Sequence, residues 1–293
     1  MKLTFKLILS LLLVATYNLL PDAKYALGIE VLLILLVGIP HGATDHLLFN
    51  VFKYNKVNSK LSFSFLLPYL GVMVVYAIFW ILFPQLSLII FLIISAYHFG
   101  ETQWFKRFTF SSNNLRNTFY FLWGVSLISS IFFIFPNQSF FYLKNLVTVD
   151  FFTSFQDKIP FISGLSTANW VAFLFYTKER FSWVSIMEFG FLLLTVYFTD
   201  LLFGFVVFFT IWHSVDAIKN QIETLRKFKP SFSLIHFIVE ALPFTFISLF
   251  GISFFLLIFF KLDLKISYVT LFFIAISVLT LPHMWIIERF YRN

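Results

Sequence analysis

The segment 62–83 reads SFSFLLPYLGVMVVYAIFWILF and contains no charged residue. A helix that crosses the hydrocarbon core of a bilayer needs about 20 predominantly apolar residues. The segment has that length. An uninterrupted apolar run of this kind is typical of a transmembrane helix rather than of an amphipathic helix with one face in water. It therefore predicts a membrane-spanning helix.

Similar apolar stretches recur along the whole chain. We expect spanning helices near 3–20, 25–46, 62–83, 86–104, 115–135, 161–177, 183–199, 201–218, 233–260 and 266–287. The first is interpreted as a span and not as a signal peptide, because no small-residue cleavage site follows it. The close pair 183–199 and 201–218 predicts a tight hairpin around Asp200. The predicted fold class is all-α: one polytopic integral membrane domain, residues 1–293, with about ten transmembrane helices (8–10).

The composition supports this interpretation. Of the 293 residues, 60% are hydrophobic and 12% are charged, whereas a soluble domain carries about 25% charged residues. The net charge of +7 raises the question of nucleic acid as a partner. The basic residues lie in short clusters between apolar runs, so the lipid bilayer is the expected partner and nucleic acid is not. The chain has no cysteine, which excludes disulfides and thiolate metal sites.

Basic residues alternate with the predicted spans, and this alternation orients the chain. Clusters follow the second, fourth, sixth, eighth and tenth spans, whereas the intervening connections are poorer in basic residues or balanced by acids. The clusters are Lys53, Lys56 and Lys60; Lys106, Arg107 and Arg116; Lys178 and Arg180; Lys219, Arg226, Lys227 and Lys229; and Arg289 and Arg292. The positive-inside rule then predicts that both termini are cytoplasmic. We expect the chain to lie in the plasma (cell inner) membrane.

Four of the six histidines lie inside or at the end of apolar stretches. They are His41, His98, His213 and His283. On the predicted topology they occupy the second, fourth, eighth and tenth spans, which run in the same direction, and each lies near the cytoplasmic end. Ionisable groups inside a membrane are costly and usually functional. Four imidazoles at one depth on parallel helices predict a shared metal site toward the cytoplasmic side, and His46 and His236 are interpreted as interfacial.

A carboxylate follows three of these histidines at a spacing of about one helical turn. The pairs are His41 with Asp45, His98 with Glu101, and His213 with Asp216. This spacing places both side chains on one helical face. A histidine that binds a metal usually gives its other N–H to a carboxylate or carbonyl. The three acids are therefore candidates to orient the histidines or to act as further ligands; alternatively, they mark the aqueous ends of the helices.

The local motifs are GIPHGATDH (Gly38–His46), SAYHFGE (Ser95–Glu101), IWHSVD (Ile211–Asp216) and LPHM (Leu281–Met284). Together, and in this order across nearly the whole chain, they resemble the Brp/Blh family of bacterial and archaeal membrane β-carotene 15,15′-dioxygenases. The resemblance implies a non-haem Fe(II) site, held by His41, His98, His213 and His283 as metal-binding and catalytic residues. It also implies that O₂ splits the central double bond of β-carotene into two retinals, commonly for a rhodopsin.

The chain departs from this family at one position. Members can carry a second histidine four residues after the third motif histidine, and here that position is Ala217. The metal sphere would then be completed by His283, Asp216 or water. Candidates to line a substrate tunnel are Tyr97, Phe99, Trp212 and Trp285, although ordinary packing or an interfacial aromatic belt would also explain them. Pro40 and Pro282 each precede a motif histidine, and we expect each to kink its helix.

Two other classes of function stay open. A transporter or proton-relay protein would use intramembrane histidines and acids, but it would distribute them through the bilayer and not collect them at one side. A membrane protein that binds carotenoid or retinal without cleaving it is the other alternative, because of Ala217. A rhodopsin is disfavoured, since no lysine lies in the middle of a predicted span to form a Schiff base.

Overall fold

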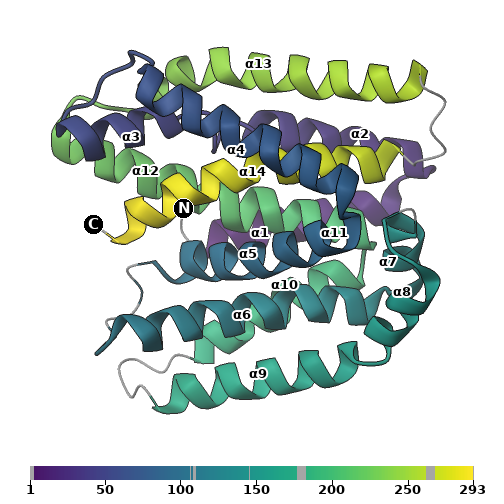
Figure 1. Cartoon of the computed structure of the whole chain (residues 1–293). Coiled ribbons are helices and arrows are strands. Elements are labelled where there is room, and N and C mark those ends of the chain that lie inside the picture. The colour runs from purple at the N-terminus through teal and green to yellow at the C-terminus, as the bar shows by residue number, and fades with distance from the viewer. Residues whose placement is uncertain are drawn as a thin grey trace. The chain divides into compact units, whose positions relative to one another are not determined.

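The computed structural model describes residues 3–105, 107, 110–144, 146–176, 183–261 and 268–292, and no β-strand occurs among them. The elements in Figure 1 are α1 (Leu3–Leu19), α2 (Ala23–Leu33), η1 (Ile34–Gly38), α3 (Asp45–Tyr54), α4 (Phe63–Leu82), α5 (Pro84–Trp104), α6 (Asn113–Ile134), α7 (Pro136–Leu143), α8 (Val149–Gln156), α9 (Ile159–Tyr176), α10 (Trp183–Tyr197), α11 (Leu201–Val207), η2 (Phe208–Ser214), α12 (Val215–Phe228), α13 (Leu234–Lys261) and α14 (Tyr268–Arg292). The prediction of an all-helical fold is confirmed.

Six helical stretches of the described chain are long and apolar enough to cross a membrane. They are Phe63–Leu82, Pro84–Trp104, Asn113–Ile134, Leu201–Phe228, Leu234–Ile258 and Thr270–Arg289. Three apolar helices are shorter: Leu3–Leu19, Ile159–Phe175 and Trp183–Tyr197. The total of about ten spans and the cytoplasmic side of the termini stay predictions. Among the basic residues used for that orientation, Lys106, Lys178 and Arg180 and the side chain of Arg292 lie outside the described part of the chain.

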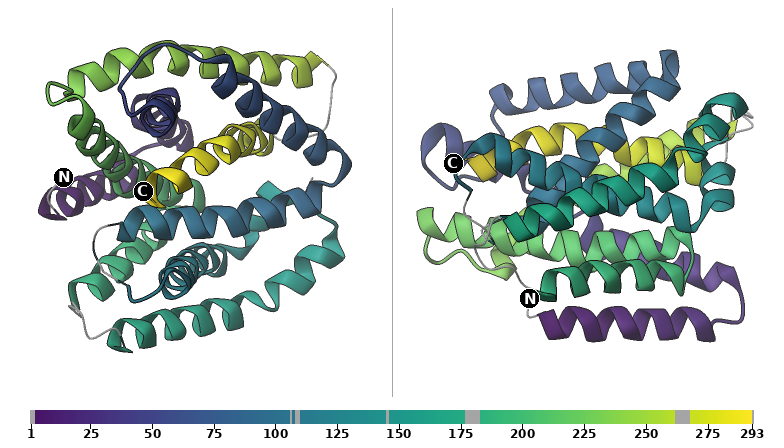
Figure 2. Two further views of the ribbon diagram at one scale, coloured as in Figure 1. Left: turned by 60° about the vertical axis from the view of Figure 1, so that its left-hand side comes forward. Right: turned by 90° about the horizontal axis from the view of Figure 1, so that it is seen from below.

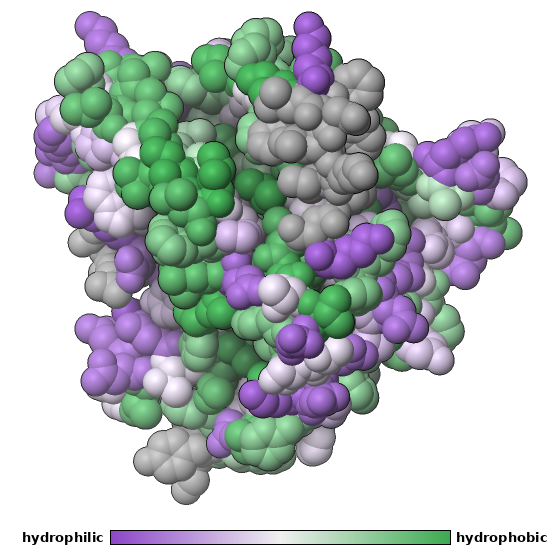
Figure 3. Space-filling model, turned by 45° about the vertical axis from the view of Figure 1, so that its right-hand side comes forward, coloured by the Kyte–Doolittle hydropathy of each residue, from purple (hydrophilic) through white to green (hydrophobic). Residues whose placement is uncertain are grey.

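Large apolar side chains are exposed along α4 and α13. On α4 they include Leu67 and Val75, and on α13 they include Phe246 and Phe250, which are 66% and 74% exposed. Apolar residues, drawn green, cover much of the face seen in Figure 3. Soluble monomers rarely expose apolar surface on this scale, so these helices are suited to contact with lipid.

The expected helix over 25–46 is interrupted. Helix α2 ends at Leu33, a π-helical segment η1 continues to Gly38, and turns follow until α3 begins at Asp45. The prediction of one continuous helix was therefore wrong over its last third. Pro40 explains the break, because proline lacks the backbone N–H that a helix needs and disfavours helical geometry in Ile39 before it. By contrast, α14 continues through Pro282.

The predicted break at Asp200 is confirmed. Helix α10 ends at Tyr197 and α11 begins at Leu201. The Asp200 carboxylate accepts a hydrogen bond of 2.8 Å from the backbone N–H of Phe203 and also accepts one of 2.9 Å from the Tyr17 hydroxyl. An aspartate at this position satisfies a donor that the first turn of a helix leaves unpaired.

The chain divides into two compact units, Met1–Ile34 with Leu92–Asp216, and Leu35–Phe91 with Ala217–Asn293. In the first unit α6 and α9 run side by side (Figure 1), and α11 packs against α2 and α10. Its core is rich in aromatic residues, among them Trp123, Trp170 and Trp212. In the second unit α14, yellow in Figure 2, packs against α3, α4 and α13. That the whole chain forms a single domain stays a prediction.

Candidate metal centre

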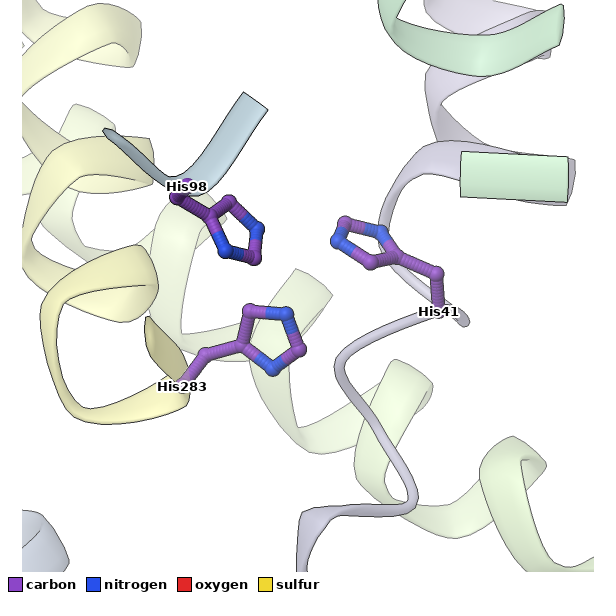
Figure 4. Close-up of side chains that lie close together, drawn as sticks. All are labelled: His41, His98 and His283. Carbon is purple, nitrogen blue, oxygen red and sulfur yellow. The ribbon is translucent and has the colours of Figure 1, made fainter. Parts of the chain in front are cut away.

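In the second unit, His41 and His283 face each other (Figure 4). His41 lies in the turn after η1, and His283 lies on α14. Their ring centroids are 4.9 Å apart and the rings meet edge to face at 89°. Both side chains are buried. The interruption of the helix at Pro40 and the long helix α14 thus bring together two histidines that are 242 positions apart in the sequence.

His283 is oriented by a carboxylate from the start of α3. Its Nδ1 atom donates to Oδ1 of Asp45 at 2.8 Å, and the Tyr69 hydroxyl donates to Oδ2 of Asp45 at 2.9 Å. With Nδ1 engaged in this way, Nε2 is the atom of His283 that would bind a metal. The sequence had placed Asp45 beside His41 on one helical face; the interrupted helix removes that relation, and Asp45 contacts His283 instead.

His41 is held by its own backbone. Its Nδ1 atom donates to the carbonyl oxygen of Gly38, and its carbonyl oxygen accepts a hydrogen bond of 2.9 Å from Nε2 of Gln221. The Oε1 atom of Gln221 in turn accepts a hydrogen bond of 2.8 Å from the Thr44 hydroxyl. Gln221 is buried. Gln221 therefore holds the turn at both His41 and Thr44. Because Nδ1 of His41 bonds to Gly38, Nε2 of His41 is the candidate ligand atom.

The packing around His283 is tight at position 42. A Cβ atom on Gly42 would lie 3.3 Å from Nδ1 of His283, which is closer than ordinary side-chain packing. The backbone of the turn thus touches the edge of the imidazole that bonds to Asp45.

In the first unit, His98 and His213 form a second pair. His98 lies on α5 and His213 lies on η2. Their ring centroids are 4.8 Å apart with an interplanar angle of 69°. Both side chains are buried. The ring of Phe209 stacks on His213 at a centroid distance of 5.6 Å, and Phe99 contacts it at 5.0 Å.

The helix that carries His213 is locally a π-helix, which the sequence did not predict. It runs from Phe208 to Ser214, and the Ser214 hydroxyl donates to the carbonyl oxygen of Phe209 at 2.8 Å. π-helical turns are rare and occur frequently at functional sites. The second such segment, η1, ends three residues before His41. Both segments therefore adjoin candidate ligands.

The two remaining acids have other partners. Glu101 accepts a hydrogen bond of 3.3 Å from the Tyr97 hydroxyl, which also donates to Asn117 at 3.2 Å. Asp216 forms an ion pair with Lys6 of α1. Tyr97 is thus part of a polar network as well as a candidate for the tunnel wall.

The other tunnel candidates differ in their surroundings. Trp212 is fully buried and its Nε1 donates to Ser10 at 3.0 Å. Trp285 is partly exposed and the Arg289 guanidinium lies 4.4 Å from its ring centroid. Phe99 contacts the candidate ligand His213, with ring centroids 5.0 Å apart.

The two histidines interpreted as interfacial have separate environments. His236 lies in the first turn of α13, where its Nδ1 accepts hydrogen bonds from Ser233. His46 is buried in the first turn of α3, with Nε2 3.6 Å from Glu240.

Sequence reasoning missed three residues that support the second unit's pair: Tyr69, Thr44 and Gln221. Tyr69 lies within an apolar run and Gln221 within a polar one, so neither differs from its neighbours in the pattern. For Thr44, the local signal that could have been used is its position directly before the candidate residue Asp45.

The sequence model of the β-carotene 15,15′-dioxygenase family matches residues 32–291. No curated protein and no solved structure matches the chain significantly. The match covers most of the chain and includes His41, His98, His213 and His283. The chain therefore belongs to the β-carotene 15,15′-dioxygenase family.

Proposed function

We propose that the chain cleaves the central 15,15′ double bond of β-carotene with O₂ and that His41, His98, His213 and His283 hold one Fe(II) ion for this reaction. The observation that carries the proposal is that each compact unit separately presents a buried pair of histidines. Family membership supports the reaction. The donor set supports the metal, since imidazole suits iron among the first-row metals.

The spacing within each pair fits a shared ion. Two imidazoles bound to one metal at about 2.1 Å place their ring centroids roughly 4.5–5.5 Å apart. The separations here are 4.9 Å and 4.8 Å. A carboxylate at Nδ1 of His283 also matches the support that metal-binding histidines usually have.

The chemistry needs little from the protein beyond placement. One carbon–carbon double bond and the O–O bond break, and two aldehyde C=O bonds form, so the reaction balances without a reductant. When bound, Fe(II) would supply the activation of O₂, with coordination positions left open by the four histidines. The buried rings exclude water, and Phe99 beside His213 is proposed to contact the polyene.

Lipid is the natural source of the substrate. β-Carotene is insoluble in water and would enter from the bilayer that the apolar helices are suited to contact. We propose that the chain is an integral protein of the plasma membrane, with the metal site toward the cytoplasmic side. Supply of retinal to a rhodopsin stays a prediction.

Expression in a bacterial host that makes β-carotene tests the proposal. We expect the orange colour to be lost and retinal to appear in the membrane extract. Neither change should occur when iron is chelated. The variants His41→Ala, His98→Ala, His213→Ala and His283→Ala should each abolish retinal formation, whereas His236→Ala should retain it. Intact β-carotene beside correctly inserted wild-type protein would favour the non-cleaving, carotenoid-binding alternative.

A further inference from the structure

Helix α1 lies outside the part of the chain that the family model matches, yet it carries two buried polar side chains. They are Lys6 and Ser10, which are 3% and 0% exposed. α1 packs against η2 and α10 in the same compact unit. A buried lysine in an apolar helix is costly unless it is paired. Its partners therefore indicate what the helix does.

Both side chains contact the residues that flank His213. Lys6 forms an ion pair with Asp216, and its Nζ atom donates to the carbonyl oxygen of Trp212 at 3.5 Å. The same ammonium lies 5.2 Å from the centroid of the Trp212 ring. Ser10 accepts a hydrogen bond of 3.0 Å from Nε1 of Trp212. α1 thus holds the chain immediately before His213 and three residues after it.

These contacts bear on an unusual piece of backbone. His213 lies near the end of the π-helix η2, which continues into α12 through Val215. Its imidazole direction depends on the geometry of that transition, and the Phe209 ring constrains one face of the imidazole. Releasing Lys6 would leave the Asp216 carboxylate, whose side chain is 17% exposed, without its cation. A partly buried charge that loses its partner destabilises its surroundings.

We propose that Lys6 is a positioning residue: with Ser10, it clamps the π-helical segment so that His213 is directed at the metal, and it engages Asp216 as a counter-ion and not as a metal ligand. This inference rests on the proposed function in so far as His213 binds the metal. It also adds to that function a part of the chain that the family comparison does not cover.

The test uses the full chain in lipid nanodiscs, with Co(II) as a spectroscopic probe of the site. The variants are Lys6→Met, Asp216→Asn and the double variant Lys6→Met/Asp216→Asn, each close in shape to the original side chain. The control is Lys24→Met, since Lys24 pairs with Asp22 at an exposed position. The dissociation constant for Co(II) and the amide hydrogen exchange of residues 208–216 are measured for each.

Each single variant should weaken Co(II) binding about tenfold or more, as loss of a residue that orients a ligand does. The double variant should lose no more affinity than either single variant, because all three lack the same ion pair. Exchange over 208–216 should rise in both single variants and in the double variant, because none of them forms the ion pair. Ser10→Ala, a milder change that keeps the ion pair, should weaken binding about threefold.

Several results would overturn the clamp. If Lys6→Met binds Co(II) with wild-type affinity and shows wild-type exchange over 208–216, Lys6 does not position His213. A far larger loss of affinity in Asp216→Asn than in Lys6→Met would make Asp216 a ligand. If wild type itself binds no Co(II), the proposed metal function fails instead. The clamp is then decided by the exchange of 208–216 alone, where an unchanged Lys6→Met variant would refute it.

Discussion

The Oδ1 atom of Asp45 lies 2.8 Å from Nδ1 of His283, across 238 positions of sequence. This bond joins the first turn of α3 to α14 and fixes which imidazole nitrogen would face a metal. Tyr69 donates to the second oxygen of the same carboxylate. The carboxylate thus couples an α4 hydroxyl to a candidate ligand.

Asp45→Asn tests this arrangement. The amide keeps the shape but lacks the charge that favours the Nδ1–H tautomer of His283, so metal affinity should fall about 10- to 100-fold. Tyr69→Phe, which leaves the carboxylate in place, should cost less. Co(II) titration of the purified variants measures both. Equal affinity in Asp45→Asn and wild type would show that the bond does not orient a ligand.

Gly42→Ala should disturb His283 by steric contact. The added methyl group would lie 3.3 Å from Nδ1 of the imidazole, so the ring must give by a few tenths of an ångström at the atom that bonds to Asp45. We expect retinal formation to fall by about tenfold or more, in line with the loss of one orienting contact. Gly71→Ala is the matched control, because a Cβ atom there meets nothing within 4 Å. Comparable activity in the two variants would count against tight packing at position 42.

Gln221→Met removes the amide that fixes the turn of His41. The side chain volume is nearly kept, but the hydrogen bonds to the His41 carbonyl and the Thr44 hydroxyl are lost. Leaving buried polar groups unpaired costs about 1–3 kcal/mol, and we expect metal affinity to fall accordingly. Lys219→Met, two residues earlier and with a side chain that is 55% exposed, should bind metal normally. If the two variants behave alike, the turn does not depend on Gln221.

Gly100→Ala should destabilise the first unit. A Cβ atom on Gly100 of α5 would collide with the backbone carbonyl of Tyr120 on α6, and one on Gly124 would collide with that of Ala96. Forcing the helices apart should cost roughly 1–3 kcal/mol or more. Gly164→Ala on α9, where nothing lies within 4 Å, is the control. Thermal unfolding in detergent compares them, and an unchanged midpoint for Gly100→Ala would contradict this crossing.

Much of the fold follows from local features of the sequence. Charge-free stretches such as 62–83 appear as helices, and Asp200 separates α10 from α11 as expected. The four candidate histidines were recognisable because an imidazole stands out in an apolar run. Their pairing, His41 with His283 and His98 with His213, depends on how the helices pack and has no local signature.

The remaining features could not be predicted for specific reasons. The prediction of one helix over 25–46 failed because the chain leaves helical geometry at Pro40, whereas helix α14 continues through Pro282. The π-helical segments differ from α-helix by a small change in hydrogen bonding that residue types do not determine. The partner of Asp216 is Lys6, 210 positions away, and only tertiary structure reveals it.

Cleavage stoichiometry in a purified system tests the central claim most directly. The full chain, loaded with Fe(II) in nanodiscs, is given β-carotene and O₂, and the products are quantified by chromatography. The account predicts two retinals for each β-carotene consumed, in wild type and not in His41→Ala or His213→Ala. β-Carotene left unchanged by well-folded, iron-loaded protein, or cleavage into two fragments of unequal length, would contradict it.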